Sequence, residues 1–149
     1  MRKLFLVTLV AGLPLLAQDA GSPLSANTKW LYGFSKGNIS KAADKMPEEN
    51  YAFKPSDDVR TFGQLVGHVA DANYMFCSAV LGEKAPVSGI EKSKTTKADL
   101  TAALKESFAY CDKAYDAMTD AEGAKMVKFF GAERPKLGVL DFNNMHDYE

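Results

Sequence analysis

The sequence predicts an all-α protein, a four-helix bundle with an N-terminal signal peptide. Apolar residues recur at helical spacing in successive stretches of about 20 residues, which places them on one face of each helix. The 149 residues suffice for one domain with one core. A charged and then apolar segment precedes these stretches and is typical of an export signal.

The first 17 residues carry this export pattern. Arg2 and Lys3 precede the apolar run Leu4–Leu16. A membrane-spanning helix needs about 20 apolar residues, so this run is too short to span a membrane. Ala17 ends a usable but imperfect cleavage site. We expect a signal peptide at residues 1–17, a periplasmic or secreted protein, and no stable membrane anchoring after cleavage. An uncleaved amphipathic anchor is the alternative.

The charge balance excludes one class of partner. Without residues 1–17 the chain keeps 16 basic and 19 acidic side chains, a net charge of −3. A general nucleic-acid binder would carry a basic excess on one face. We therefore expect no nucleic-acid partner.

The first predicted helix spans Leu24–Met46 and ends before Pro47, because the residue before a proline avoids the α region. Asn27 and Asn38 fall on its inward side, where they need hydrogen-bond partners. Its apolar stripe, with Trp30 at the edge, consists of Leu24, Leu31, Phe34, Ala42 and Met46. In the following connection, Pro47–Arg60, we expect two aromatic side chains to attach the loop to one end of the bundle, Tyr51 and Phe53.

The second predicted helix, Phe62–Leu81, has the clearest signals. Thr61 and Gln64 have the spacing of a capping box, and Gly82 is a typical C-terminal stop. His68 lies about 110° from the centre of the apolar stripe, so it flanks the core and can reach both a neighbouring helix and water.

A long polar connection, Glu83–Lys97, follows. Its fifteen residues can reach about 50 Å when extended, whereas a 20-residue helix is about 30 Å long. The connection can therefore return along the whole second helix, so that the next helix runs parallel to it. This third helix is predicted at Ala98–Met118, with a weaker capping box at Thr96 and Asp99. Its expected inner face consists of Leu100, Ala103, Leu104, Ser107, Cys111, Ala114, Tyr115 and Met118.

The last part of the chain holds a second connection, Thr119–Lys136, and a fourth helix, Leu137–Glu149. No glycine or proline ends this helix, so we expect an incomplete last helix and a chain that is a fragment of a longer one. An unfinished helix leaves an apolar strip that would favour a homodimer. Four apolar side chains of the connection are expected to cover the open end of the core, Met126, Val127, Phe129 and Phe130.

The two cysteines leave two interpretations open. Cys77 and Cys111 each fall on or beside the apolar stripe of a predicted helix, which favours two small buried side chains. A disulfide is the alternative, since an exported protein meets an oxidising compartment. Such a bridge would need Cα atoms within about 7 Å.

The only two histidines are candidate metal ligands. His68 and His146 lie on different predicted helices, and imidazoles that project inward from facing helices are a common start of a metal site. Glu149, three residues after His146, completes a set of two histidines and one carboxylate. The alternative interpretation is that the two histidines bind no metal and simply lie at the edges of the apolar faces of their helices. Three polar neighbours are candidates for fixing the ring tautomers, namely Gln64, Asp71 and Asn143.

Four segments resemble the DinB/YfiT-like superfamily: Trp30-Leu-Tyr-Gly-Phe34, Met46-Pro-Glu-Glu, Arg60-Thr-Phe-Gly-Gln-Leu-Val-Gly-His68 with Ala70-Asp71-Ala72-Asn73, and Asn144-Met-His-Asp-Tyr-Glu149. The resemblance implies a bundle in up-down-down-up order over residues 24–149. It also implies a divalent metal, zinc or nickel, held by three histidines. His68 and His146 match two of them, and the third position falls one residue past Glu149.

Two function classes follow from these observations. The first is an exported divalent-metal-binding bundle, a metal-dependent thiol transferase or hydrolase acting on a small molecule, because some members of the family transfer or isomerise thiol adducts. The second is a non-catalytic exported bundle that binds a small apolar ligand or a protein partner in its cleft. A thiol handler that uses Cys77 or Cys111 is the weakest hypothesis, because neither cysteine lies in a cluster of cations.

Overall fold

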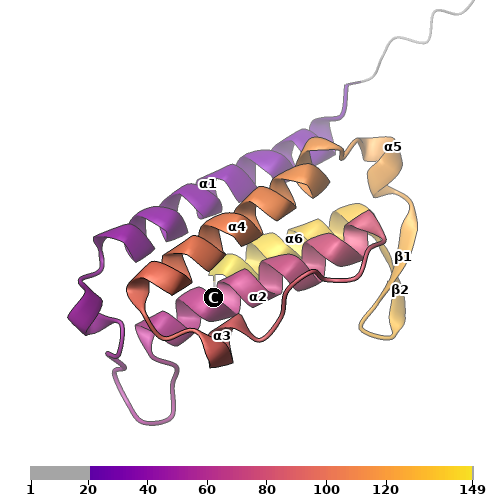
Figure 1. Cartoon of the computed structure of the whole chain (residues 1–149). Coiled ribbons are helices and arrows are strands. Elements are labelled where there is room, and N and C mark those ends of the chain that lie inside the picture. Colours follow the sequence, from indigo (N-terminus) through magenta and orange to yellow (C-terminus); the bar gives the residue numbers. More distant parts are fainter. Residues whose placement is uncertain (1–20, 149) are drawn as a thin grey trace, which may run out of the picture.

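The computed structural model describes residues 21–148, so the predicted signal peptide and Glu149 lie outside the described residues. The fold is mostly helical, and its four long helices are α1 (Pro23–Lys45), α2 (Phe62–Leu81), α4 (Lys97–Asp116) and α6 (Lys136–Tyr148) (Figure 1). The shorter elements are a 3-10 helix (Glu48–Asn50), α3 (Ile90–Ser93), α5 (Asp120–Gly123), β1 (Met126–Phe129) and β2 (Ala132–Pro135). None of the described helices is long and apolar enough to cross a membrane.

The long helices share two directions. α2 and α4 run one way, and α1 and α6 run the opposite way (Figure 1). The connection between α2 and α4 therefore returns along α2, and α3 forms within it and packs against α2. The described ends of the long helices lie within two residues of the predicted ones. The predicted Thr61–Gln64 capping box is confirmed in full.

The core lies chiefly between α2 and α4. Most of the predicted inner face of α4 is buried, including Leu100, Leu104 and Tyr115. A disulfide joins Cys77 of α2 to Cys111 of α4, with Cα atoms 5.3 Å apart and both side chains fully buried. The preferred prediction of two separate buried thiols is wrong, because the parallel pairing of α2 and α4 brings the two Cα atoms within bonding range.

Most of the predicted inner face of α1 is wrong, although Leu31 and Met46 are half-buried and Met46 packs against the core. Leu24, Trp30 and Phe34 are exposed by 63%, 66% and 51%, and both Asn27 and Asn38 are exposed as well. The buried face instead consists of small or hydroxyl-bearing residues, namely Ser25, Thr28, Tyr32, Ser35 and Ala43. Two of these side chains find partners on other helices: Thr28 donates to Asp141 at 2.8 Å, and Tyr32 to the Phe108 carbonyl at 2.9 Å. The buried Ser35 hydroxyl has no hydrogen-bond partner among the described residues. Hydrogen bonds to other helices thus outweigh apolar periodicity at Thr28 and Tyr32.

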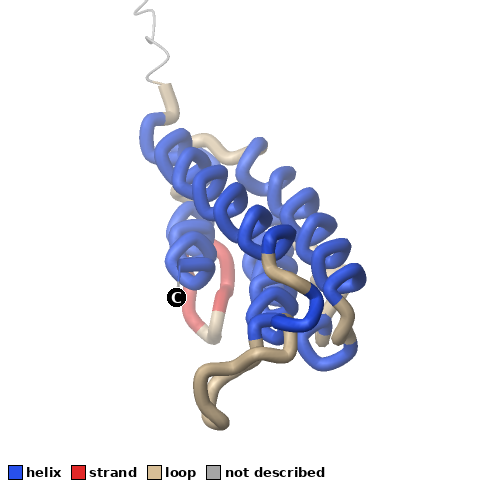
Figure 2. Tube along the Cα trace, turned by 90° about the vertical axis from the view of Figure 1, so that its left-hand side faces the viewer, coloured by secondary structure: helices blue, strands red, loops and turns tan. Residues whose placement is uncertain are grey.

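The all-α expectation fails at one place. The predicted connection between α4 and α6 contains α5 and an antiparallel hairpin of β1 and β2, which packs against α2 and α6 (Figure 2). Phe130 and Gly131 make its two-residue turn, both with positive φ. Of the four side chains expected to cover the core, Phe129 is buried and Val127 is half-buried, but Met126 and Phe130 are exposed. In the earlier connection Tyr51 is buried, whereas Phe53 is exposed.

Reduction of the disulfide is expected to lower the free energy of unfolding by about 3–4 kcal/mol, because the bridge closes a loop of 34 residues in the unfolded chain. Urea denaturation with and without reductant measures this change. The Cys77→Ala/Cys111→Ala double variant serves as the control and should unfold at the same urea concentration in both buffers. An equal midpoint for the oxidised and reduced native chain would contradict the prediction.

Candidate metal centre

The two histidines meet between α2 and α6. The capping box at Thr61 starts α2 two turns before His68, whose side chain is 31% exposed. His146 lies near the end of the described part of α6. The Nε2 atoms of the two rings are 3.1 Å apart, and the ring centroids are 4.9 Å apart. The structure therefore brings together two residues that are 78 positions apart in the sequence.

This ring geometry suits two kinds of contact. A separation of 3.1 Å is a hydrogen-bond distance between a ring N–H and a ring nitrogen. It also fits two ligands of one ion: with metal–nitrogen bonds of about 2.1 Å, nitrogens this far apart subtend about 95°. Within residues 21–148, however, no group of three or more His, Cys, Asp or Glu is arranged to hold a metal. Glu149, the predicted third ligand, lies outside the described residues.

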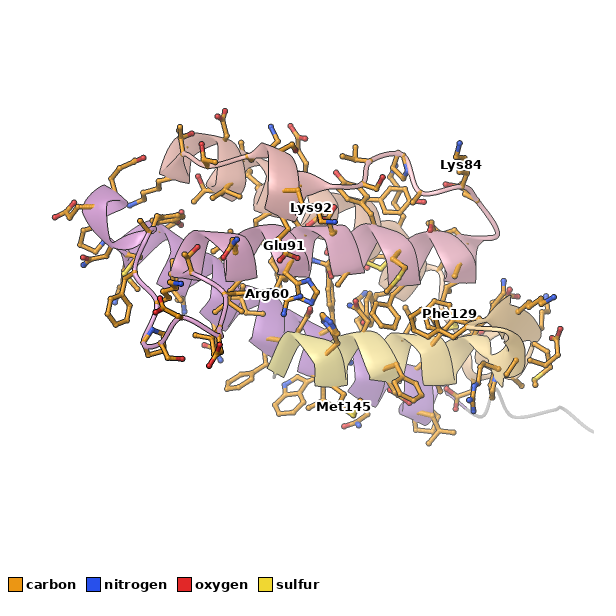
Figure 3. All side chains as sticks on the ribbon, turned by 90° about the horizontal axis from the view of Figure 1, so that it is seen from below. Arg60, Lys84, Glu91, Lys92, Phe129 and Met145 are labelled. Atoms are coloured by element: carbon orange, nitrogen blue, oxygen red, sulfur yellow. A yellow bond between two sulfur atoms is a disulfide. The ribbon has the colours of Figure 1, made fainter. Side chains whose placement is uncertain are left out.

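A carboxylate lies behind His68. The Nδ1 atom of His68 is 2.9 Å from Oε2 of Glu91, and the Nε atom of Arg60 donates to Oε1 of the same residue at 2.8 Å. Burial works to raise the pKa of Glu91, but the hydrogen bonds from Arg60 and His68 outweigh it and hold that pKa below its ordinary value. Figure 3 shows Arg60 and Glu91 close together beside α2. Glu91 is therefore a charged acceptor for the ring N–H.

None of the three residues predicted to fix the ring tautomers contacts either ring in a described hydrogen bond. Gln64 completes the capping box at the start of α2. Asp71 accepts from the backbone N–H groups of Ile90 and Glu91 at the start of α3. Asn143 is fully buried one turn before His146, and its amide donates to Asn73 and to the Tyr115 hydroxyl rather than to a ring. The carboxylate that contacts the His68 ring is that of Glu91 instead.

A buried polar network fixes α6. Asn143 donates to Oδ1 of Asn73 and to the Tyr115 hydroxyl, each at 3.2 Å. That hydroxyl lies 3.1 Å from the Leu140 carbonyl oxygen and 2.9 Å from Oδ1 of Asn144. Asn144 in turn donates to the Thr28 carbonyl at 3.0 Å. These bonds tie α6 to α1, α2 and α4, which sets the rotation of α6 and so the direction of His146.

A cavity of about 350 Å³ opens beside the imidazole pair. Asp147 lines it together with His68 and His146, and neither carboxyl oxygen of Asp147 has a hydrogen-bond partner within the described part of the chain. Burial raises the pKa of Asp147 to about 7. The other lining residues are Arg60 and six apolar ones, Ile39, Ala42, Phe62, Leu65, Val66 and Val69.

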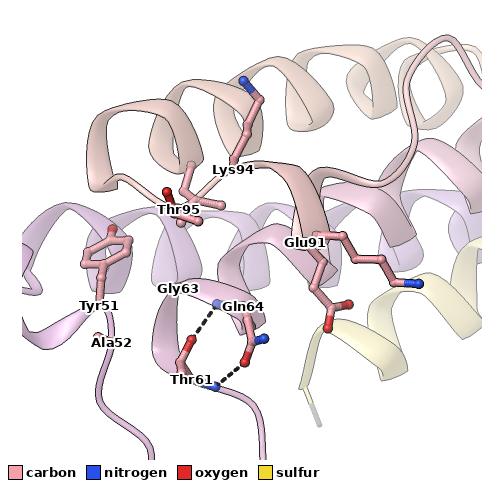
Figure 4. A pocket seen from close by; sticks show the side chains of 10 residues that line it. Tyr51, Ala52, Thr61, Gly63, Gln64, Glu91, Lys94 and Thr95 are labelled. Carbon is pink, nitrogen blue, oxygen red and sulfur yellow. Dashed lines mark hydrogen bonds between the residues drawn. The ribbon is translucent and has the colours of Figure 1, made fainter.

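A second, larger cavity of about 530 Å³ lies on the other side of Glu91 and contains neither histidine (Figure 4). It is lined by the capping box of α2 and by Gly63, where a Cβ atom would come within 3.1 Å of the Tyr51 carbonyl oxygen. Glu91 thus borders this cavity, while its carboxylate contacts a residue of the first one.

Sequence reasoning missed Glu91 and Asp147. Glu91 lies in a polar, lysine-rich connection with no periodic pattern, 23 positions from the ring it contacts, so no local signal identifies it. Asp147 directly follows His146, and its position on the inner side of α6 was open to a helical-face argument.

Tyr115→Phe is expected to lower the free energy of unfolding by about 1–3 kcal/mol, because it leaves buried groups of α6 without their shared hydroxyl partner. Urea denaturation measures the loss. Tyr110→Phe is the matched control: its hydroxyl meets Glu83 at the surface, so its loss should cost less than about 1 kcal/mol. Equal effects of the two substitutions would show that the buried network does not hold α6.

Comparison with known proteins agrees with the sequence resemblance. The family model that describes the DinB superfamily matches residues 34–149 of the sequence. The crystal structure of a DinB-like protein from Bacillus cereus ATCC 10987 is similar, with a TM-score of 0.72, 14% identity and 83% of each chain covered. A mycothiol-dependent maleylpyruvate isomerase has a TM-score of 0.68 and 17% identity. The match covers 83% of this chain but only 57% of the isomerase.

At these identities the two structures establish the fold alone. No curated protein sequence matches this chain. The family match, which covers most of the chain, decides the assignment: the protein belongs to the DinB superfamily.

Proposed function

We propose that this protein is an exported up-down-down-up four-helix bundle that holds a divalent ion, zinc or nickel, and acts as a metal-dependent thiol transferase or hydrolase. The observation that carries the proposal is the 3.1 Å approach of the Nε2 atoms of His68 and His146. Glu149, three residues after His146 in the sequence, is the proposed third ligand. Three protein ligands leave one position open, as in catalytic zinc sites.

The side chains around the histidines support a small-molecule reaction. An ion held there supplies Lewis acidity, which lowers the pKa of a thiol or water and polarises an electrophile. The cavity of about 350 Å³ is large enough for a small substrate. Six apolar residues form most of its wall, and Arg60, whose Nε is paired with Glu91, lies at its edge.

A thiol cosubstrate is supported by the structural neighbour whose name states a dependence on mycothiol. Because this chain spans 57% of that isomerase, residues supplied by the rest of the isomerase have no counterpart in the match. We therefore propose the class of reaction, transfer of a thiol or of water to an electrophile, rather than the isomerase's substrate.

Export is supported by the disulfide. A buried bridge between Cys77 and Cys111 persists in oxidising compartments such as the periplasm and is rare in the cytosol. This agrees with the proposed signal peptide at residues 1–17 and a bundle domain at 24–149. It also argues against a thiol handler that uses these cysteines, because bonded sulfurs are not nucleophiles.

A second function, non-catalytic binding of a small apolar ligand or a protein partner, is favoured by the six apolar residues that line the cavity. Native mass spectrometry of protein purified without an affinity-tag metal separates the two functions. A bound ion supports the metalloenzyme, whereas a bound organic molecule without an ion supports the alternative.

Replacing either histidine is expected to abolish metal retention. His68→Ala and His146→Ala each remove a proposed ligand. Loss of a group that only hydrogen-bonds a ligand lowers metal affinity by about 10–100-fold, so loss of a ligand should lower it further. Elemental analysis after dialysis measures the metal per chain. Met145→Ala, an exposed neighbour on α6, is the control and should keep the native content. Unchanged content in both histidine variants would refute the metal site.

A further inference from the structure

The short helix α3 is clamped onto α2 around His68. Both oxygens of Asp71 are used, since Oδ1 accepts from the backbone N–H of Ile90 and Oδ2 from that of Glu91, each at 2.9 Å. The Ile90 side chain is buried in the core, at 2% exposed. The backbone of Glu91 is therefore held from one side by a carboxylate that lies three residues after His68 on α2.

Gly67 allows α3 to approach so closely. A Cβ atom at this position would lie 2.7 Å from Cα of Glu91 and 2.9 Å from its N atom, distances that real Cβ contacts do not reach. Gly67 and Asp71 thus lie on either side of His68 along α2, and both act on the backbone of Glu91. Together they fix the position from which the Glu91 side chain reaches the ring.

The Glu91 carboxylate decides which ring nitrogen of His68 carries the proton. It accepts from Arg60 Nε at 2.8 Å, so it is paired with a permanent cation and offers only acceptors to His68. A neutral His68 must then carry its hydrogen on Nδ1, 2.9 Å from Glu91, and keep the lone pair of Nε2 toward His146. A lone pair on Nε2 is what a metal ligand needs.

We propose that Glu91 is a positioning residue for His68: it fixes the tautomer and the orientation of the ring, so that Nε2 is preset for an ion shared with His146. The inference deepens the proposed metal function. Its consequence for ion binding rests on that function. His146 must present its own Nε2 lone pair to such an ion. With His68 in the Nδ1–H form, the hydrogen between the two Nε2 atoms would belong to His146. For an ion to bind, that hydrogen would pass to solvent and His146 would take up one from solvent on its Nδ1, while the His68 tautomer stays unchanged.

The test measures the tautomer and the affinity separately. The chain holds two histidines, so ¹⁵N-histidine labelling gives two sets of ring signals, which the His146→Gln variant assigns. In the metal-free native chain, His68 should show the Nδ1–H form. Glu91→Ala should give mixed tautomers at His68 and a zinc affinity about 10–100-fold lower, measured by competition with a chelator. Glu91→Gln keeps an acceptor oxygen and should restore most of the Nδ1–H form.

Two further variants separate positioning from general structure. Glu133→Gln removes an exposed carboxylate of β2 and should change neither readout. Gly67→Ala alters no hydrogen-bonding group but displaces α3, so it should mix the His68 tautomers as Glu91→Ala does. Circular dichroism checks that each variant keeps the native helix content.

The outcomes distinguish the inference from the proposed function. An unchanged His68 tautomer in Glu91→Ala overturns the inference, and so does an unchanged zinc affinity in a chain that binds zinc. If the native chain binds no zinc but its His68 tautomer depends on Glu91, the metal function fails and positioning by Glu91 stands. If the native chain binds zinc and both readouts move, the inference is supported together with the metal site.

Discussion

The parallel alignment of α2 and α4 is the constraint on which the rest of the structure depends. Two parallel helices cannot be joined by a short turn, so the chain between them must return along the length of α2. That return brings α3 against the face of α2 that carries His68, and it places Glu91 beside the ring. The same alignment brings Cys77 and Cys111 into bonding range. One feature of topology thus produces both the bridge and the carboxylate partner of the site.

Hydrogen bonding, more than apolar burial, determines how the outer helices join this pair. α1 turns small and hydroxyl-bearing residues inward and leaves Trp30 and Phe34 at the surface. α6 is tied to the other three long helices through Asn143, Asn144 and the Tyr115 hydroxyl. A buried polar network is stable only when its members find partners, so it favours one rotation of α6 over others. That rotation directs His146 toward His68 and leaves Asp147 at the wall of the cavity.

The two histidine environments differ, and the difference bears on chemistry. His68 has its outer nitrogen against a carboxylate that is paired with Arg60, so its lone pair is preset on Nε2. Asp147, next to His146, is a buried carboxyl whose pKa burial raises to about 7. The small, largely apolar cavity that these groups line suits a small substrate that few polar groups orient.

The sequence by itself determined the extents of the four long helices, the capping box of α2 and most of the inner face of α4, because helical periodicity and capping act over a few residues. It predicted His68 and His146 as the candidate pair. Only the tertiary structure decided the polar inner face of α1, the hairpin, the disulfide and the role of Glu91. Each of these depends on partners far apart in the chain, as with the 23 positions between His68 and Glu91, and no local pattern encodes which distant groups will meet.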